Sequence, residues 1–280
     1  MTENYDDWIG RQDVTEALVT AYQADALTAT LDRDDPPFRD GDAIPPGWHQ
    51  FYIREVVKLR DTAEDGHPKR GGFLPPIPLP RRMWAGTAST FHRPIRVGER
   101  IRKVSTIEAV TPKTGKTGRL VFLRLVHEIS GEDGVATTEV QDIVYREAAK
   151  PGAAAPEPPA APGTAVWKRA IHPTTVLLFR FSALTMNSHR IHYDRSYVTG
   201  VEKYPGLLVH GSLTQILLMD LFRRERPDAV LKTFSVRAVS PLYDTSDFTV
   251  EGTPGADGAS ATLWALNHEG RLAMSAEATF

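Results

Sequence analysis

The residues most able to do chemistry are the histidines of the stretch FSALTMNSHRIHYDRSYVTGVEKYPGLLVHG, residues 181–211. His189, His192 and His210 all lie in it, and the chain has no cysteine. Imidazole is the side chain whose ordinary pKa lies nearest to neutral pH, so it can act as a general base or bind a metal. The third interpretation, an ordinary surface or core histidine, stays open for each residue taken alone.

A metal site is one interpretation of this cluster. His189, His192 and Asp194 together offer two nitrogen ligands and one oxygen ligand at close spacing. Their order matches neither the HExxH pattern of zinc proteases nor a cysteine-histidine zinc knuckle. We therefore expect no metal ion.

Acid–base catalysis is the other chemical interpretation. His192 would be a general base, and Asn187, five residues earlier, would be its partner on the same loop. Gly211 comes directly before an apolar run, and the first N–H groups of a helix have no partner within the helix. Because glycine has no Cβ, a substrate oxygen can approach its N–H closely. A base beside such a donor is what the addition of water to a polarised double bond requires.

Further polar side chains are candidates for binding the substrate. The guanidinium of Arg190 suits a bidentate contact with a carboxylate, and Arg82, in PRRMWAG, is a second candidate from the first half of the chain. Tyr193 and His210 would line the pocket. An ordinary salt bridge or packing contact remains the alternative for each of them.

The elements that position this loop are predicted from periodicity and turn signals. Residues 207–226 predict an apolar helix that Pro227 ends. Thr174–Ala183 is expected to be a strand that leads into a loop. Five further runs predict strands: Trp167–Ile171, Leu231–Ala238, Asp247–Thr253, Ala259–Asn267 and Arg271–Phe280.

The first half of the chain has a similar plan. Val14–Leu31 has apolar residues at helical spacing, and residues 66–86 are too rich in proline and glycine for regular structure. Four runs then predict strands: Thr87–Val97, Arg100–Thr111, Arg119–Ser130 and Thr137–Arg146. A long apolar helix followed by a meander of strands predicts an α+β fold in which a sheet wraps around a helix.

Residues 148–165, AAKPGAAAPEPPAAPGTA, mark the clearest boundary. Proline resists both helix and sheet, so we expect an extended, exposed linker. It would separate an N-terminal unit, 1–147, from a C-terminal unit, 166–280, and a long surface loop within one domain is the alternative.

Composition bounds the function. The net charge of the 280 residues is −2, which gives no basic excess for a nucleic-acid partner. We find neither a signal peptide nor an apolar run long enough to span a membrane, and the absence of cysteine is compatible with the cytosol. A cytoplasmic protein without a membrane partner is the expectation.

The stretches FSALTMNSHRIHYD and YPGLLVHGSL resemble the hydratase motif of MaoC-like, hot-dog-fold enoyl-CoA hydratases and dehydratases. The first half is similar to the N-terminal domain of FAS1-type dehydratases at DWIG (7–10), IPPGWH (44–49), residues 65–86 and QDIVYRE (141–147). Together the two likenesses cover nearly the whole chain. The most similar group is that of the bacterial itaconyl- and mesaconyl-CoA hydratases.

The resemblance implies a double hot dog, two hot-dog units whose sheets run together, with the active site in the second. It places the catalytic histidine at His192 and the oxyanion-hole glycine at Gly211. The aspartate of the family falls at Asn187, which cannot take a proton but can hold water through its amide.

The implied reaction is reversible hydration of an enoyl-CoA to a 3-hydroxyacyl-CoA, with itaconyl- or mesaconyl-CoA giving citramalyl-CoA. Coenzyme A enters only as part of the substrate, no cofactor is expected, and a homodimer is expected because hot-dog units commonly pair. Two alternatives stay open: a 3-hydroxyacyl-thioester dehydratase of fatty-acid metabolism, and a non-catalytic thioester-binding hot-dog protein.

Overall fold

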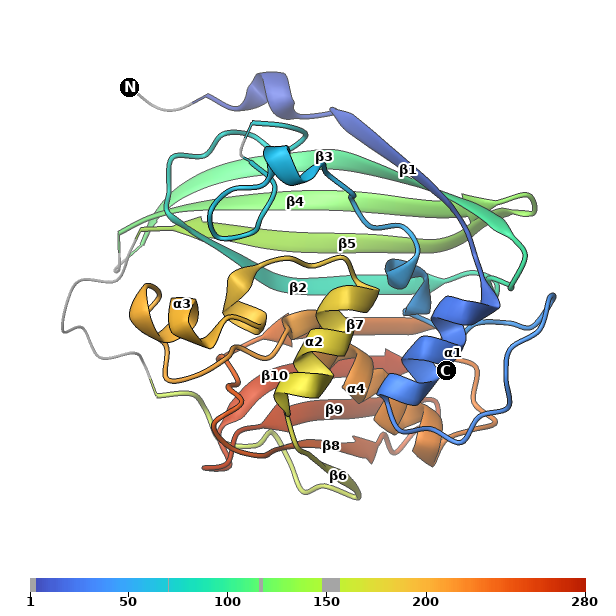
Figure 1. The fold of residues 1–280 in the computed structure, drawn as a ribbon. Helices are drawn as coiled ribbons and strands as arrows, with labels where there is room; N and C mark the ends of the chain where they lie inside the picture. The colour runs from blue at the N-terminus through green and yellow to red at the C-terminus, as the bar shows by residue number, and fades with distance from the viewer. Residues whose placement is uncertain (1–3, 70, 116–117, 148–156) are drawn as a thin grey trace.

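The computed structural model of the chain describes residues 4–69, 71–115, 118–147 and 157–280. Its strands form one antiparallel sheet in the order β1-β3-β4-β5-β2-β7-β10-β9-β8-β6 (Figure 1). The first half of the chain supplies β1 (Gln12–Leu18), β2 (Arg81–Phe91), β3 (Arg100–Gly115), β4 (Gly118–Gly131) and β5 (Gly134–Arg146). The second half supplies β6 (Trp167–Ile171), β7 (Thr233–Ala238), β8 (Phe248–Pro254), β9 (Ser260–Leu266) and β10 (Leu272–Thr279).

The two halves of the sheet meet where β2 pairs with β7, from Gly86 opposite Arg237 to Thr90 opposite Thr233. Gly86 is needed there, because a Cβ at this position would lie 2.2 Å from the carbonyl oxygen of Val236. The prediction that the two sheets run together is therefore confirmed, and with few helices against a large antiparallel sheet the chain is α+β.

The helices lie on one face of this sheet (Figure 1). They are α1 (Ala21–Thr30), α2 (Thr175–Leu184), α3 (Arg195–Gly200) and α4 (Gly211–Glu225). Single 3-10 turns occur at η1 (Asp6–Trp8), η2 (Trp48–Phe51), η3 (Leu59–Asp61) and η4 (Arg190–His192). No helix of the described ranges has both the length and the apolar character that crossing a membrane requires.

Two predicted elements are wrong. The helix expected over Val14–Leu31 is strand β1 followed by α1, because Gln12–Leu18 pairs along its whole length with β3. Thr174–Ala183, expected as a strand, belongs to helix α2, whose first turn is capped by Thr174 through a bond from the Leu177 N–H. In both cases local composition suits either state; pairing with the remote strand β3 decides the first, and the cap by Thr174 favours the helix in the second.

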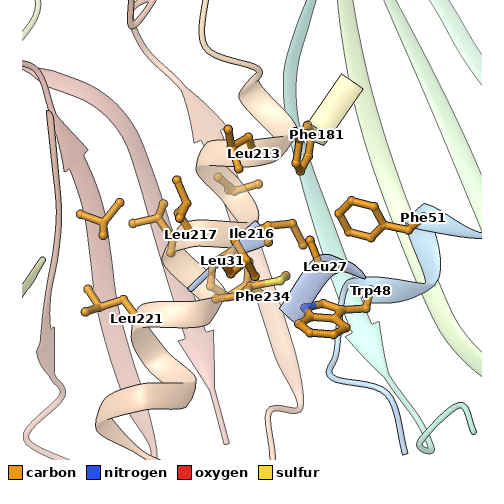
Figure 2. Packing of buried hydrophobic residues seen from close by; sticks show 14 of the residues in the cluster. Leu27, Leu31, Trp48, Phe51, Phe181, Leu213, Ile216, Leu217, Leu221 and Phe234 are labelled. Carbon is orange, nitrogen blue, oxygen red and sulfur yellow. The ribbon is translucent and has the colours of Figure 1, made fainter. Parts of the chain in front are cut away.

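Helix α4 is the predicted apolar helix, and it forms the centre of the main core (Figure 2). Its residues Leu213–Phe222 are all buried, including the polar Gln215 and Asp220. Phe181 from α2 and Phe51 from η2 meet edge to face beside it, with ring centroids 5.5 Å apart. Figure 2 shows that this core takes side chains from both halves of the chain.

Part of the predicted linker, residues 148–156, lies outside the described ranges. The part that is described, 157–165, is mostly exposed and runs beside the C-terminal half, where Ala160 pairs with Arg271. The division into units 1–147 and 166–280 stays a prediction, compatible with strands β1–β5 and β6–β10 each being contiguous in the sheet.

Candidate active site

His192 lies at the end of η4 and is buried. Its Nδ1 lies 2.7 Å from the carbonyl oxygen of Leu208. Since a carbonyl oxygen can only accept, the Nδ1 of a neutral His192 carries the proton and the Nε2 keeps its lone pair. No group of the described residues bonds this Nε2, so His192 is held in the tautomer that a general base requires.

Burial lowers the pKa of His192 to about 4. The bond to the Leu208 carbonyl raises this pKa, and the charge of His67 lowers it further. The ring of His210 stacks on His192, with centroids 3.7 Å apart and planes 16° from parallel. His210 Nε2 lies 2.9 Å from the hydroxyl of Ser182, whereas its buried Nδ1 has no partner. Burial and the neighbouring His192 also bring the pKa of His210 well below its usual value. Both imidazoles are therefore neutral near pH 7.

Gly211 is the first residue of α4, where the helix leaves the N–H without an internal partner. The indole of Trp84, from β2, covers it so closely that a Cβ at Gly211 would lie 2.9 Å from Trp84 Cε3. Glycine is thus required here by the approach of the other half of the chain. The indole is itself anchored by a bond from its Nε1 to Thr87.

Asn187 lies in the same segment, between α2 and η4, and is half-buried. Its Oδ1 accepts a hydrogen bond from the His189 N–H at 3.1 Å, and its backbone N–H bonds the carbonyl of Ser182. The amide NH₂ makes no bond within the described residues. It therefore remains a possible donor to water.

A segment of the first half, residues 63–68, docks on this loop. Ser188 donates its hydroxyl proton to the Gly66 carbonyl at 2.6 Å, and the Arg190 N–H bonds the Asp65 carbonyl at 2.8 Å. A Cβ on Gly66 would lie 1.8 Å from the Ser188 carbonyl oxygen. The sequence likeness included this segment but assigned no residue in it a role, because nothing local connects DGHP to residues 187–190.

The predicted substrate-binding residues differ in their exposure and in their bonding partners. Arg190 donates to Asp194 from Nε and NH2, at 3.0 and 2.8 Å, and its guanidinium lies 4.0 Å from the centre of the Tyr197 ring. Tyr193 is exposed and donates to the Ser188 carbonyl. Arg82 is exposed, makes no ion pair within the described ranges, and lies near enough to His189 for its charge to lower that pKa.

The metal-ligand set weighed from the sequence, His189, His192 and Asp194, does not come together. Asp194 caps α3 and pairs with Arg190, rather than joining His189 and His192. The side chains that do converge are Asp65, His67 and His189, whose potential ligand atoms all lie within 4.8 Å of one another. The expected absence of a metal stays a prediction.

A cavity of about 530 Å³ lies toward the C-terminal end of α4. Its lining includes Trp48, His49, Met219 and Arg223. Asn187, His192 and Gly211 are not among the residues that line it.

Comparisons with known proteins show the family of the chain. Residues 47–244 match the model of a family described as hydroxyacyl-thioester dehydratase type 2. The chain is 41% identical over 272 residues to a mesaconyl-C(4)-CoA hydratase of Chloroflexus aurantiacus, covering 96% of this chain and 95% of the relative.

Two solved structures show the fold. A MaoC-like dehydratase of Phytophthora capsici superposes with a TM-score of 0.71 at 12% identity, covering 99% of each chain. A Mycobacterium tuberculosis protein described as a double hot-dog fold superposes with a TM-score of 0.56 at 14% identity, covering 96% of this chain and 95% of the other. The predicted double hot dog is therefore confirmed.

Proposed function

Because the chain belongs to the hydroxyacyl-thioester dehydratase type 2 family, and so to the hydratases and dehydratases that act on acyl thioesters, we propose that His192, Asn187 and Gly211 carry out its reaction. The observation that carries this proposal is the tautomer of His192. A buried, neutral imidazole with Nδ1 bound to Leu208 presents an unprotonated Nε2. This is the state that can take a proton from water.

The mechanism follows from the placement of these groups. The Gly211 N–H, at the positive end of α4, holds the thioester oxygen and stabilises the charge that develops there. The Asn187 amide donates to the water, which adds to carbon 3 as His192 Nε2 removes its proton. His192 then returns a proton to carbon 2, so that water is added across the double bond. His210, stacked on the base and bonded to Ser182, fixes the plane of the ring.

For the acyl group we propose a short dicarboxylic acyl-CoA such as mesaconyl-C4-CoA, which would be hydrated to citramalyl-CoA. The support is the 41% identity to a mesaconyl-C(4)-CoA hydratase over nearly the whole length of both chains. Arg82, exposed near His189, and Tyr193 at the edge of the site are candidates for contacting the coenzyme A part. Arg190 positions the loop through Asp194 and the Glu64 carbonyl.

The family match also supports the reverse reaction, dehydration of a 3-hydroxyacyl thioester of fatty-acid metabolism. The same three groups would serve, because the forward and reverse paths share one transition state. We further propose that the protein needs no cofactor, acts in the cytoplasm and forms a homodimer, the arrangement in which hot-dog units commonly pair.

The test is an assay of water addition to mesaconyl-C4-CoA, crotonyl-CoA and a long-chain enoyl-CoA, with wild type and His192→Ala in parallel. Loss of the base should lower kcat by about 100- to 10,000-fold on the preferred substrate. His268→Gln, which changes an exposed histidine, is the matched control and should keep wild-type rates. Near-normal turnover by His192→Ala would refute the assignment, and thioester binding without turnover by wild type would mean a non-catalytic protein.

A further inference from the structure

Arg54 is a cation held inside the protein without a counter-ion. Its NH2 donates to Gln50 Oε1 at 2.7 Å, and this is the one hydrogen bond that it makes with the described residues. Its Nε is buried and has no partner. Burial lowers its pKa to about 10, although Glu139 acts in the opposite direction. A buried guanidinium with unused donors is unfavourable unless an anion completes it.

Arg54 lies near His210. It follows η2, whose Phe51 packs on Phe181, and Phe181 in turn lies 4.9 Å from His210 between ring centroids. The charge of Arg54 is close enough to His210 to contribute to lowering its pKa. His210 is the ring stacked on His192. The charge of Arg54 thus acts on the ring that is stacked on the proposed base.

Arg54 follows a short turn that stands where the second half has its central helix. In the C-terminal half, the Val209 N–H bonds the Leu242 carbonyl, and the 15-residue α4 begins two residues later. In the N-terminal half, the Ile44 N–H bonds the Ile95 carbonyl in the same way, but only the four-residue turn η2 follows. Residues 48–54 therefore replace a helix.

The sheet face opposite this segment is polar. Ser105, His127, Glu139 and Ser89 stand directly opposite one another across β3, β4, β5 and β2. Glu139 Oε1 lies 3.1 Å from His49 Nε2 and accepts a bond from Ser89 at 3.0 Å. Burial raises the pKa of Glu139, but these partners outweigh it and bring the pKa to about 2. The one carboxylate of this group is thus committed to other side chains.

A second cation lies close to Arg54. Lys103, on β3, donates to the Ile53 carbonyl at 2.9 Å, and burial together with the charge of Arg54 lowers its pKa. The carboxylates of Glu139, Asp13 and Glu55 act on Lys103 in the opposite direction. Glu139 is the one carboxylate whose charge acts on Arg54, and it is bonded to His49 and Ser89, so the unused donors of Arg54 can take a further anion.

We propose that Arg54 is the specificity-determining residue that binds a carboxylate carried by the acyl group of the substrate, opposite the thioester end. This subsite rests on the proposed function, since it selects among the acyl-CoAs that His192 hydrates. A carboxylate attached to carbon 3 would lie next to the carbon that water attacks. The guanidinium donates its unused N–H groups to this carboxylate, and their arrangement fits its planar shape.

The test compares the binding of two unreactive thioesters by calorimetry. Succinyl-CoA carries a carboxylate on carbon 3, and butyryl-CoA carries a methyl group in its place. Wild type should bind succinyl-CoA more tightly. Arg54→Met should weaken succinyl-CoA binding by about 10- to 100-fold and leave butyryl-CoA binding within about threefold, because a hydrogen bond to a charged group is lost only for the first.

Gln50→Glu is the sharper variant, since it keeps the shape of Gln50 and gives Arg54 an internal carboxylate at the place of its present acceptor. It should abolish the preference for succinyl-CoA while the protein stays folded. Arg82→Met, at a residue proposed to contact coenzyme A, should weaken both thioesters alike and so keep the preference. Arg39→Met, at an exposed arginine without a side-chain partner among the described residues, is the matched control.

Equal weakening of both thioesters by Arg54→Met would overturn the proposal, because it would indicate contact with the coenzyme A phosphates. An unchanged preference for succinyl-CoA in Gln50→Glu would also overturn it, and so would loss of this preference in Arg82→Met. The proposed function fails separately, if wild type prefers succinyl-CoA but hydrates no enoyl-CoA.

Discussion

At the scale of single residues, the site depends on the environment of ordinary side chains. His192 is a usable base because one carbonyl, that of Leu208, fixes its tautomer and because burial keeps it neutral. His189 is affected more strongly, since burial and the charges of His67 and His192 lower its pKa to about 2. A row of neutral imidazoles results, in which His192 is held by a backbone carbonyl and keeps its Nε2 unbonded.

The pH dependence of the rate tests this environment. The active form of His192 is neutral, and its pKa of about 4 means that kcat/KM should stay flat from pH 8 to about pH 5 and fall below pH 4. Initial rates over this range, with circular dichroism to verify folding, measure it. A fall centred on pH 6.5, the ordinary value of histidine, would contradict the burial argument.

The lowered pKa of His192 also makes the free energy of unfolding depend on pH. Between pH 6.5 and pH 4 the unfolded His192 takes up a proton that the folded residue does not, so the free energy of unfolding should decrease as pH falls through this window. The contribution is fully present above pH 6.5. His192→Gln should remove this part of the pH dependence.

At the scale of elements, the catalytic segment is held between α2 and α3 by a loop from the other half of the chain. Carbonyls of residues 63–68 accept bonds from the Ser188 hydroxyl and the Arg190 N–H, and the segment approaches so closely that only glycine can occupy position 66. Small displacements of a base relative to its substrate cost rate steeply. The loop should therefore affect activity although none of its residues is assigned to proton transfer.

Gly66→Ala tests this docking. Its Cβ would overlap the Ser188 carbonyl, so we expect kcat/KM to fall by about 10- to 100-fold with the fold retained. Gly71→Ala is the matched control, since Gly71 has a similar positive φ, +93° against +87°, but no atom within 4 Å of the added Cβ. If both variants lose activity equally, backbone strain rather than docking is the cause.

At the scale of the whole molecule, the two halves are joined by the β2–β7 seam and by a buried charge cluster. Asp220, on α4, accepts bonds from Arg33 NH1 at 2.7 Å, Arg169 NH1 at 2.9 Å and Arg224 Nε at 2.7 Å. Its side chain is 2% exposed, and Arg33 belongs to the first half. One carboxylate therefore links α4 to β6 and to the segment after α1.

Asp220→Asn should lower the free energy of unfolding by about 3–5 kcal/mol, because it removes a buried anion shared by three guanidinium groups, of which Arg33 alone keeps another carboxylate, that of Asp35, among the described residues. Urea unfolding followed by fluorescence measures the loss. Asp247→Asn, at an exposed contact with His172, should change it by less than about 0.5 kcal/mol. A small effect of Asp220→Asn would mean that the β2–β7 seam and the shared core hold the halves together without this carboxylate.

Patterns of local origin were predictable from the sequence. Strands β3–β10 and the central helix α4 follow from alternation and from apolar periodicity bounded by proline, and their observed bounds differ from prediction by four residues at most. Strand β2 lies six residues earlier at both ends than the predicted run Thr87–Val97. The errors at Val14–Leu31 and Thr174–Ala183 arose where short runs suit either state. There, pairing with β3 and capping by Thr174 decide the outcome.

The sequence by itself determined the family and the double hot dog, and it led to the proposal of His192, Asn187 and Gly211 as the site, because the motifs are carried by residues near one another in a recognisable order. Only the tertiary structure decided what surrounds them: Trp84 over Gly211, Gly66 against Ser188, and Arg54 near His210. Each of these pairs is more than 100 residues apart in the chain. Such contacts depend on how the two halves dock, which no local pattern records, and it is docking that sets burial, pKa and the charge presented to a substrate.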